Sequence, residues 1–84
     1  MALSMQFSLY PLRQDRLGPT IEEALAVLRN QGLVVETGEM SSVTWGPEDQ
    51  MFAALKEAFL KSAERGPVVW VITLSNACPV PETA

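Results

Sequence analysis

Residues 68–74 read Val-Val-Trp-Val-Ile-Thr-Leu, the clearest strand pattern in this chain. β-Branched and aromatic side chains of this kind are enriched in strands. Val69 and Val71 would point to one face of a sheet, and Trp70 and Ile72 to the other. A strand that is apolar on both faces is usually buried on both faces. We therefore expect helices of the same chain over one face of the sheet and a second subunit over the other.

A helix pattern precedes this strand. Residues 46–49, Gly-Pro-Glu-Asp, are typical of a helix start, because proline is favoured at the first helical position and acidic side chains complement the positive end of the helix dipole. Gly66 and Pro67 end the pattern. The side chains expected to face the sheet are Met51, Phe52, Leu55, Ala58, Phe59, Ser62 and Ala63.

Further upstream, the residues predict a second helix and a β-hairpin. Thr20 and Glu23 have the spacing of a capping box at a helix start, and Gly32 suits the left-handed position after a helix. The apolar stripe expected on this helix consists of Ile21, Ala24, Leu25 and Leu28. Residues 33–37 and 40–45 have the pattern of two strands joined by a tight turn. In the second of these strands, the side chains expected on one common face are Met40, Ser42 and Thr44.

The first strand is predicted from Met5 to Leu12, with Phe7 and Leu9 facing the core. The element order is then strand, helix, strand, strand, helix, strand, which is typical of the ferredoxin-like split βαβ arrangement. We therefore expect an α+β βαββαβ sandwich, with a four-stranded antiparallel sheet and two helices on one face. Its 84 residues suffice for one domain, expected over residues 5–79, with residues 80–84 as an extended C-terminal tail.

The composition argues against several classes of function. The chain has no histidine and a single cysteine, Cys78, so His-based catalytic triads and Cys/His zinc sites are not expected. The net charge of −4 argues against nucleic acid and anionic lipid as partners, and it is compatible with a cationic small molecule. We expect no enzymatic activity, no cofactor and no metal. The longest apolar stretch is too short to span a bilayer and no secretory signal is supported, so a cytoplasmic protein without direct membrane insertion is predicted.

The sheet face away from the helices is expected to carry mild polar groups. Spacing alone favours an ordinary wet face or a polar interface. The functional interpretation is a flat pocket for a small heteroaromatic ligand, with Tyr10 or Trp45 stacking on the ring and hydroxyl groups reading its edge. The polar residues expected on this face are Gln6, Ser8, Tyr10, Ser42 and Thr44.

Four segments resemble one known family. Residues 6–12, Gln-Phe-Ser-Leu-Tyr-Pro-Leu, resemble the first-strand signature of the YkoF-like thiamine/hydroxymethylpyrimidine-binding family. Residues 40–43 resemble its hairpin strand, residues 51–59 its second helix, and residues 74–79 its exit from the last strand. The resemblance extends over nearly the whole chain. Better-known members carry two such repeats in one chain, whereas this chain carries one.

The resemblance implies a ferredoxin-like domain that binds thiamine or its hydroxymethylpyrimidine moiety without known chemistry, in thiamine precursor uptake or salvage. It also implies that two copies associate, as a dimer or tetramer, to rebuild the two-repeat arrangement. Two alternatives remain open: an ACT-like regulatory domain that binds an amino acid at a subunit interface, and a purely structural oligomerisation module. The ligand-binding residues carried over by matching position are Ser8, Tyr10, Glu39, Met40, Ser42 and Asn76.

Overall fold

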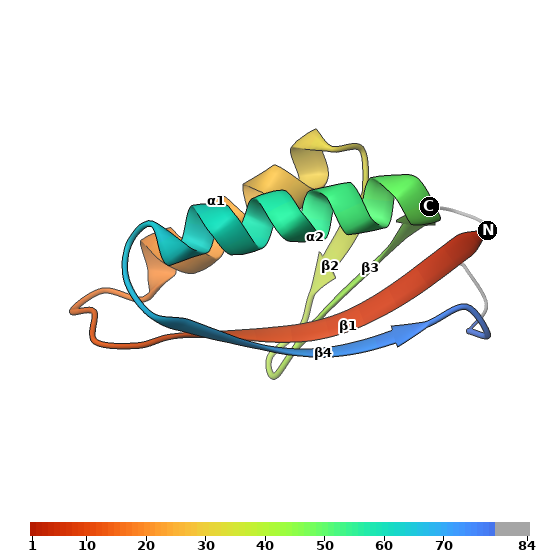
Figure 1. Cartoon of the computed structure of the whole chain (residues 1–84). Helices are drawn as coiled ribbons and strands as arrows, with labels where there is room; N and C mark the ends of the chain where they lie inside the picture. The colour runs from red at the N-terminus through yellow and green to blue at the C-terminus, as the bar shows by residue number, and fades with distance from the viewer. Residues whose placement is uncertain (79–84) are drawn as a thin grey trace.

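The fold is a four-stranded antiparallel sheet covered on one face by two helices, as the computed structural model in Figure 1 shows for residues 1–78. The strand order is β2-β3-β1-β4. This confirms the expected ferredoxin-like α+β sandwich. The end of the expected domain at residue 79 and the expected tail over residues 80–84 lie outside the described residues. The elements are β1 (Ala2–Pro11), α1 (Gly18–Asn30), β2 (Val34–Thr37), β3 (Ser42–Pro47), α2 (Glu48–Ala63) and β4 (Val68–Ser75).

The central strand β1 begins at Ala2 rather than at Met5, where the sequence pattern had placed its start. The reason is that Leu3 continues the alternation of Met5 and Phe7, and all three side chains are buried beneath the helices. Leu9 is half-buried at the end of the same row. The alternation expected for this strand is therefore confirmed, and it extends further toward the N-terminus.

Helix α2 faces the core with a different stripe from the expected one. Its buried side chains are Met51, Ala54, Ala58 and Ser62, whereas Phe52 and Phe59 are about half exposed. The prediction that these two rings point inward was wrong, as was the inward position of Ala63, which is exposed. Small side chains allow α2 to lie close to its neighbours, since protein interiors leave few voids.

Trp70 of β4 fills the space that the rings of α2 leave. Its indole stacks on Phe7, with ring centroids 5.4 Å apart and an angle of 24° between the planes. Its Nε1–H donates to Ser62 Oγ at 3.1 Å, and that hydroxyl donates to the carbonyl of Phe59 at 2.8 Å. The aromatic core therefore comes from the sheet rather than from α2.

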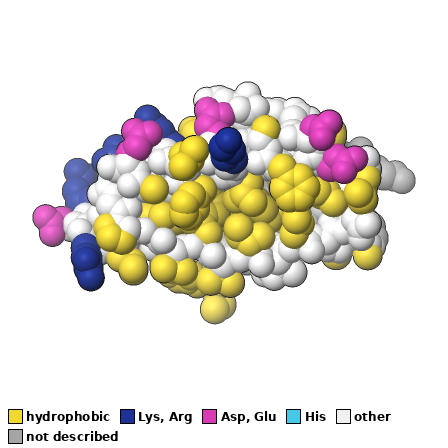
Figure 2. Space-filling model, viewed as in Figure 1, with side chains coloured by type: hydrophobic (Ala, Val, Ile, Leu, Met, Phe, Trp, Pro, Cys, Tyr) yellow, Lys and Arg dark blue, Asp and Glu magenta, His cyan; other side chains and the backbone are white. Residues whose placement is uncertain are grey.

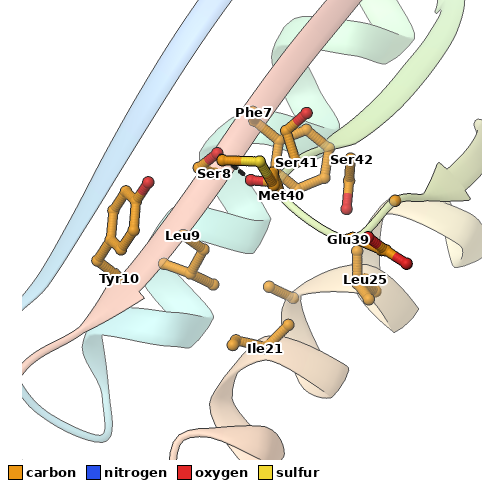
Figure 3. Close-up of a pocket in the computed structure, with 12 residues that line it drawn as sticks. Phe7, Ser8, Leu9, Tyr10, Ile21, Leu25, Glu39, Met40, Ser41 and Ser42 are labelled. Atoms are coloured by element: carbon orange, nitrogen blue, oxygen red, sulfur yellow. Dashed lines mark hydrogen bonds between the residues drawn. The ribbon is translucent and has the colours of Figure 1, made fainter.

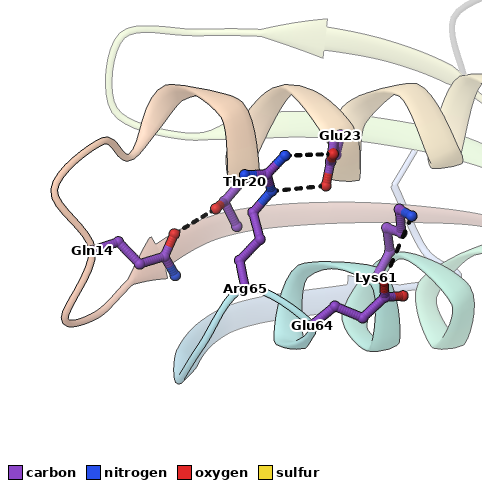
Figure 4. A network of polar contacts seen from close by, with 6 residues as sticks. All are labelled: Gln14, Thr20, Glu23, Lys61, Glu64 and Arg65. Atoms are coloured by element: carbon purple, nitrogen blue, oxygen red, sulfur yellow. Dashed lines mark hydrogen bonds and ion pairs between the residues drawn. The ribbon is translucent and has the colours of Figure 1, made fainter.

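Both helix starts also differ from expectation. Helix α1 begins at Gly18 without a side-chain cap, and the expected capping box does not form. Thr20 is instead buried and donates to Gln14 Oε1 at 2.6 Å, while Glu23 accepts from Arg65 (Figure 4). Pro47 is the extended last residue of β3 rather than the first helical residue of α2. Gly32 follows α1 with φ +90°, the left-handed conformation predicted from its position.

An ion pair joins the end of α2 to α1. Arg65 Nη2 donates to Glu23 Oε1 at 2.7 Å, and Arg65 Nε donates to Glu23 Oε2 at 3.1 Å. These hydrogen bonds from Arg65 hold the pKa of Glu23 below its ordinary value. A carboxylate with a lowered pKa contributes stability above its unfolded-state pKa and loses that contribution as the pH falls through its folded-state pKa.

We therefore expect Glu23→Gln to lower the melting temperature only slightly at neutral pH, since solvent reaches both side chains of the ion pair and screens it. The difference from the wild type should vanish in strong acid, where the wild-type carboxylate is protonated. Thermal unfolding followed by circular dichroism at both pH values measures this. The matched control is Glu22→Gln, which removes an exposed neighbouring charge. If the difference in melting temperature between the wild type and Glu23→Gln persisted unchanged in acid, it would not come from the ion pair of Glu23 with Arg65.

Candidate functional site

The sheet has a gap on one side of β1. Pairing of β1 with β3 stops at Phe7, opposite Ser42, whereas pairing with β4 continues to Pro11, opposite Val68. Residues 8–11 of β1 therefore have no neighbouring strand on the β3 side. The loop of residues 38–41, which joins β2 to β3, borders this gap, and α1 borders it from the helix layer (Figure 3).

A hollow of about 200 Å³ occupies the gap, and we call it the β1 notch. Its wall combines apolar side chains of the core layer with the polar loop. Because β1 lacks a partner strand here, part of its backbone edge is available to hydrogen-bond a ligand. The residues that line the β1 notch are Phe7, Ser8, Leu9, Tyr10, Ile21, Ala24, Leu25, Gly38, Glu39, Met40, Ser41 and Ser42.

Five of the six residues expected to bind a ligand line the β1 notch: Ser8, Tyr10, Glu39, Met40 and Ser42. They come from two segments that are about thirty residues apart in the chain. The pairing of β1 with β3 brings these segments together.

Two polar contacts hold the loop against β1. Ser8 Oγ donates to the carbonyl oxygen of Met40 at 3.2 Å. Two residues earlier in β1, Gln6 Nε2 donates to Ser41 Oγ at 3.0 Å. Each such hydrogen bond contributes about 0.5–1.5 kcal/mol net to stability. The two bonds therefore stabilise this position of the loop only modestly. The Met40 side chain itself is almost fully exposed.

Ser42 and Thr44 were expected on the open face beside Ser8 and Tyr10, and this expectation was wrong. The register places Ser42 opposite Phe7, and residues directly opposite in an antiparallel pair share a face. Both side chains therefore point toward the helices. Thr44 is fully buried and donates to the carbonyl of Val34 at 2.7 Å, so its hydroxyl has a structural partner. Ser42 reaches the β1 notch from the helix side, whereas Ser8 and Tyr10 border it from the open side.

Asn76, the sixth expected residue, lies away from the β1 notch. It follows β4 at the other end of the sheet, where it lines a hollow of about 260 Å³ together with Phe52 and Leu74. Its Nδ2 lies 3.3 Å from Met1 Sδ. The structure thus does not bring Asn76 together with the other five residues.

Three residues of the β1 notch were expected only as core: Leu9, Ile21 and Leu25. Each is half-buried rather than buried, because the sheet beneath the start of α1 is incomplete. In Figure 3, Leu9 and Ile21 point into the gap between β1 and α1. Helical periodicity identified the apolar stripe of α1 correctly. It could not show that the first turns of that stripe face a hollow.

A second hollow, of about 440 Å³, lies on the open face of the sheet. Trp45 belongs to this hollow and not to the β1 notch. Its side chain is only 5% exposed, and its buried Nε1–H has no hydrogen-bond partner among the residues that the structure describes. This hollow is the competing location for a ligand. It is lined by Ser4, Met5, Gln6, Glu36, Val43, Trp45, Thr73, Ser75 and Cys78.

Two further features concern metal binding and membrane insertion of residues 1–78. This part of the chain contains no group of three or more Cys, Asp or Glu side chains arranged to hold a metal ion. None of its helices is long and apolar enough to cross a membrane.

Comparison with known proteins identifies the family. Residues 2–81, nearly the whole chain, match the model of the YKOF-related family. The chain belongs to the YKOF-related family. A search of curated proteins gave no match to it.

Solved structures share the fold of this YKOF-related protein at low sequence identity. A Streptococcus pneumoniae protein superposes with a TM-score of 0.80 at 22% identity, covering 89% of this chain and 86% of that one. A domain of unknown function from Bacillus cereus gives 0.78 at 21%, covering 96% and 83%. A candidate thiamine biosynthesis/salvage protein from Thermotoga maritima gives 0.76 at 17%, covering 88% and 82%. At these identities the likeness establishes the fold alone.

Proposed function

We propose that this YKOF-related protein binds thiamine or its hydroxymethylpyrimidine moiety, without catalysing a reaction, in thiamine precursor uptake or salvage. The observation that carries the proposal is the β1 notch, where five of the six side chains selected by family resemblance line one hollow. The family match and the Thermotoga maritima neighbour agree with a thiamine-related role.

The β1 notch suits a flat aminopyrimidine. Such a ring presents an amino donor and ring-nitrogen acceptors in its plane. The Ser42 hydroxyl can serve either kind of partner, and the Ser8 hydroxyl, which donates to the Met40 carbonyl, can still accept a hydrogen bond. The backbone edge of residues 8–11 adds further donors and acceptors. Apolar side chains on the α1 side, such as Leu25, can contact the ring face.

The size of the β1 notch favours the pyrimidine half of thiamine as the inserted part. Pockets for drug-sized ligands are usually about 300–1,000 Å³, and this hollow of about 200 Å³ is smaller. The cationic thiazolium would then lie at the rim, near the Glu39 carboxylate and the half-exposed Tyr10 ring. Attraction of a cation to an aromatic face contributes about 0.5–2 kcal/mol.

Two other functions share this fold, and ligand specificity separates them. An ACT-like regulatory domain would bind an amino acid at a subunit interface. A purely structural oligomerisation module would bind neither kind of ligand. The expected dimer or tetramer and the expected cytoplasmic location stay predictions.

We expect hydroxymethylpyrimidine and thiamine to raise the melting temperature and to release or absorb heat on titration. Amino acids should do neither. A ligand that binds only the folded state stabilises it by about 2.7 kcal/mol at one hundred times its dissociation constant, so millimolar ligand detects even weak binding. Thermal shift and isothermal titration calorimetry measure the two effects. The absence of both a thermal shift and a heat of binding with thiamine and with hydroxymethylpyrimidine at millimolar concentration would refute the proposal. A response to amino acids alone would favour the ACT-like alternative.

A further inference from the structure

The strands on either side of β1 show which of its backbone groups face the β1 notch. In an antiparallel ladder, the N–H and C=O of one residue point to the same side, and successive residues point to opposite sides. Just before β1, the carbonyl of Met1 accepts at 3.0 Å from the amide of Glu48, which directly follows β3. Just after β1, the amide of Leu12 donates at 2.9 Å to the carbonyl of Pro67, which directly precedes β4. Because both registers are continuous, odd-numbered residues of β1 turn their backbone groups toward β3, and even-numbered residues turn theirs toward β4.

Leu9 is the odd-numbered residue that loses its partner strand. Pairing with β3 ends at Phe7, so the backbone N–H and C=O of Leu9 point into the β1 notch. Pro11, the next odd-numbered residue, has no N–H and contributes only a carbonyl. Within residues 8–11, Leu9 alone therefore presents a donor and an acceptor side by side to the notch.

The loop of residues 38–41 does not supply the missing partner. If the register continued, Met40 would lie opposite Leu9. The carbonyl of Met40 instead accepts from Ser8 Oγ at 3.2 Å. The amide of Gly38 donates to the carbonyl of Ser41 at 2.8 Å, and no backbone hydrogen bond from this loop reaches Leu9. The notch therefore holds an unpaired donor–acceptor pair, which α1 and the loop partly enclose, unlike the open outer edge of β4.

We propose that the backbone of Leu9 selects the ligand of the β1 notch by its ring edge. The class selected is a heteroaromatic ring that carries an amino group next to a ring nitrogen. The Leu9 N–H donates to the ring nitrogen, and the Leu9 C=O accepts from the amino group. In a strand pair the opposite residue exchanges both of these bonds, so the ring takes the place that Met40 would have in a longer β3. The pyrimidine of thiamine has such an edge, so this assignment rests on the proposed function and narrows it.

The two hydrogen bonds also fix how the ring lies. Because the ladder hydrogen bonds run in the direction of the neighbouring strand, the ring continues the sheet beyond β1. One ring face is then turned toward the helix layer, where Ile21 and Leu25 of α1 line the hollow (Figure 3). In the same orientation, an oxo group in place of the amino group sets acceptor against acceptor, and its protonated ring nitrogen sets donor against donor. Polar groups that a wrong ligand leaves unpaired give such a site its specificity.

The largest exposed apolar surface in view offers no such selection. Hydrophobic side chains gather where α2 stands over β4, as Figure 2 shows, and they include the half-exposed Phe52 and Phe59. An aromatic compound that adheres there gains from the removal of apolar area from water. Exchange of one amino group for an oxygen changes that gain little. Discrimination between the two groups therefore separates binding at Leu9 from nonspecific binding to this surface.

Two ligands that differ in one group test the proposal by calorimetry. The probes are hydroxymethylpyrimidine and its oxo counterpart, in which an oxygen replaces the amino group and the neighbouring ring nitrogen carries a proton. We expect the oxo compound to bind at least about 10-fold more weakly, because both hydrogen bonds to Leu9 are lost. Equal binding of both probes would overturn the selection by Leu9 and leave the proposed function standing. Binding of neither probe would overturn both.

A proline variant removes the donor alone. Proline is tolerated in a strand where its N–H would face away from a partner, so Leu9→Pro loses the N–H in the notch without losing a ladder hydrogen bond. Leu9→Ala is the matched control, because it also lacks the leucine side chain and keeps the N–H. Among variants that far-UV circular dichroism shows to be folded, we expect Leu9→Pro to bind hydroxymethylpyrimidine at least about 10-fold more weakly than Leu9→Ala. Equal affinities of the two variants would overturn the proposal.

Nuclear magnetic resonance of the wild type gives a readout that needs no variant. Hydroxymethylpyrimidine should shift the Leu9 amide proton downfield, as a new hydrogen bond does, and should slow its exchange with solvent. The amides of Met5 and Phe7, which the ladder with β3 already pairs, should shift less. A Leu9 amide that is unchanged in the ligand-saturated protein would overturn the proposal, whatever the affinity of the variants.

Discussion

Replacing Leu28 with alanine is expected to lower the free energy of unfolding by about 2–5 kcal/mol. Leu28 lies on α1, is fully buried, and belongs to the cluster that joins both helices to β1. The loss combines the transfer free energy of the removed atoms with the cavity left behind. A domain of 84 residues has roughly 4–13 kcal/mol of stability in total, so this single change removes a large part of it.

Urea or thermal unfolding of the wild type and of Leu28→Ala measures the loss of unfolding free energy. Both proteins are compared at the same low concentration, because association between chains would make the apparent stability depend on concentration. In a domain of this size, each kcal/mol corresponds to about 4–8 °C in melting temperature. The matched control is Leu12→Ala, the same chemical change at an exposed loop position, where the expected effect is within about 0.5 kcal/mol. Equal effects of the two substitutions would mean that Leu28 does not occupy the core.

Replacing Tyr10 with alanine is expected to weaken thiamine or hydroxymethylpyrimidine binding by about 1–3 kcal/mol, roughly 5- to 150-fold. The substitution removes an aromatic surface at the wall of the β1 notch and leaves polar groups of the ligand unpaired. Tyr10→Phe retains the ring and should recover most of the affinity if stacking is the main interaction. Because Tyr10 is half-exposed in the single chain, the stability of the monomer should change little.

Calorimetry on the folded variants measures these affinities, and Thr73→Val is the matched control. Thr73 lines the larger hollow on the open face, so its hydroxyl should not matter for a ligand in the β1 notch. Weaker binding in Thr73→Val with unchanged binding in Tyr10→Ala would move the site to that larger hollow. If Tyr10→Ala lowers stability and leaves affinity unaltered, Tyr10 packs against a neighbouring subunit instead.

The sequence by itself determined the order of elements and much of the inner face of β1. These features depend on local patterns: a strand alternates with period two, and glycine, proline and polar clusters interrupt the regular elements. Such patterns need no knowledge of which segments meet. The resemblance to a family added five residues that the structure gathers at one hollow. The sixth residue, Asn76, lies apart from these five, because the end of β4 is away from the start of the hairpin strand.

Only the tertiary structure decided which side of α2 faces the core and which side of β3 carries Ser42. Helix α2 is apolar on two adjacent stripes, and periodicity cannot choose between them. In the folded protein the stripe with Ala54 and Ala58 faces the core, since Trp70 already fills the space that the phenylalanine rings of α2 would need. The β1 notch likewise depends on β3 stopping opposite Phe7 while β4 continues. Strand register joins residues that are distant in the chain, so no local pattern contains it.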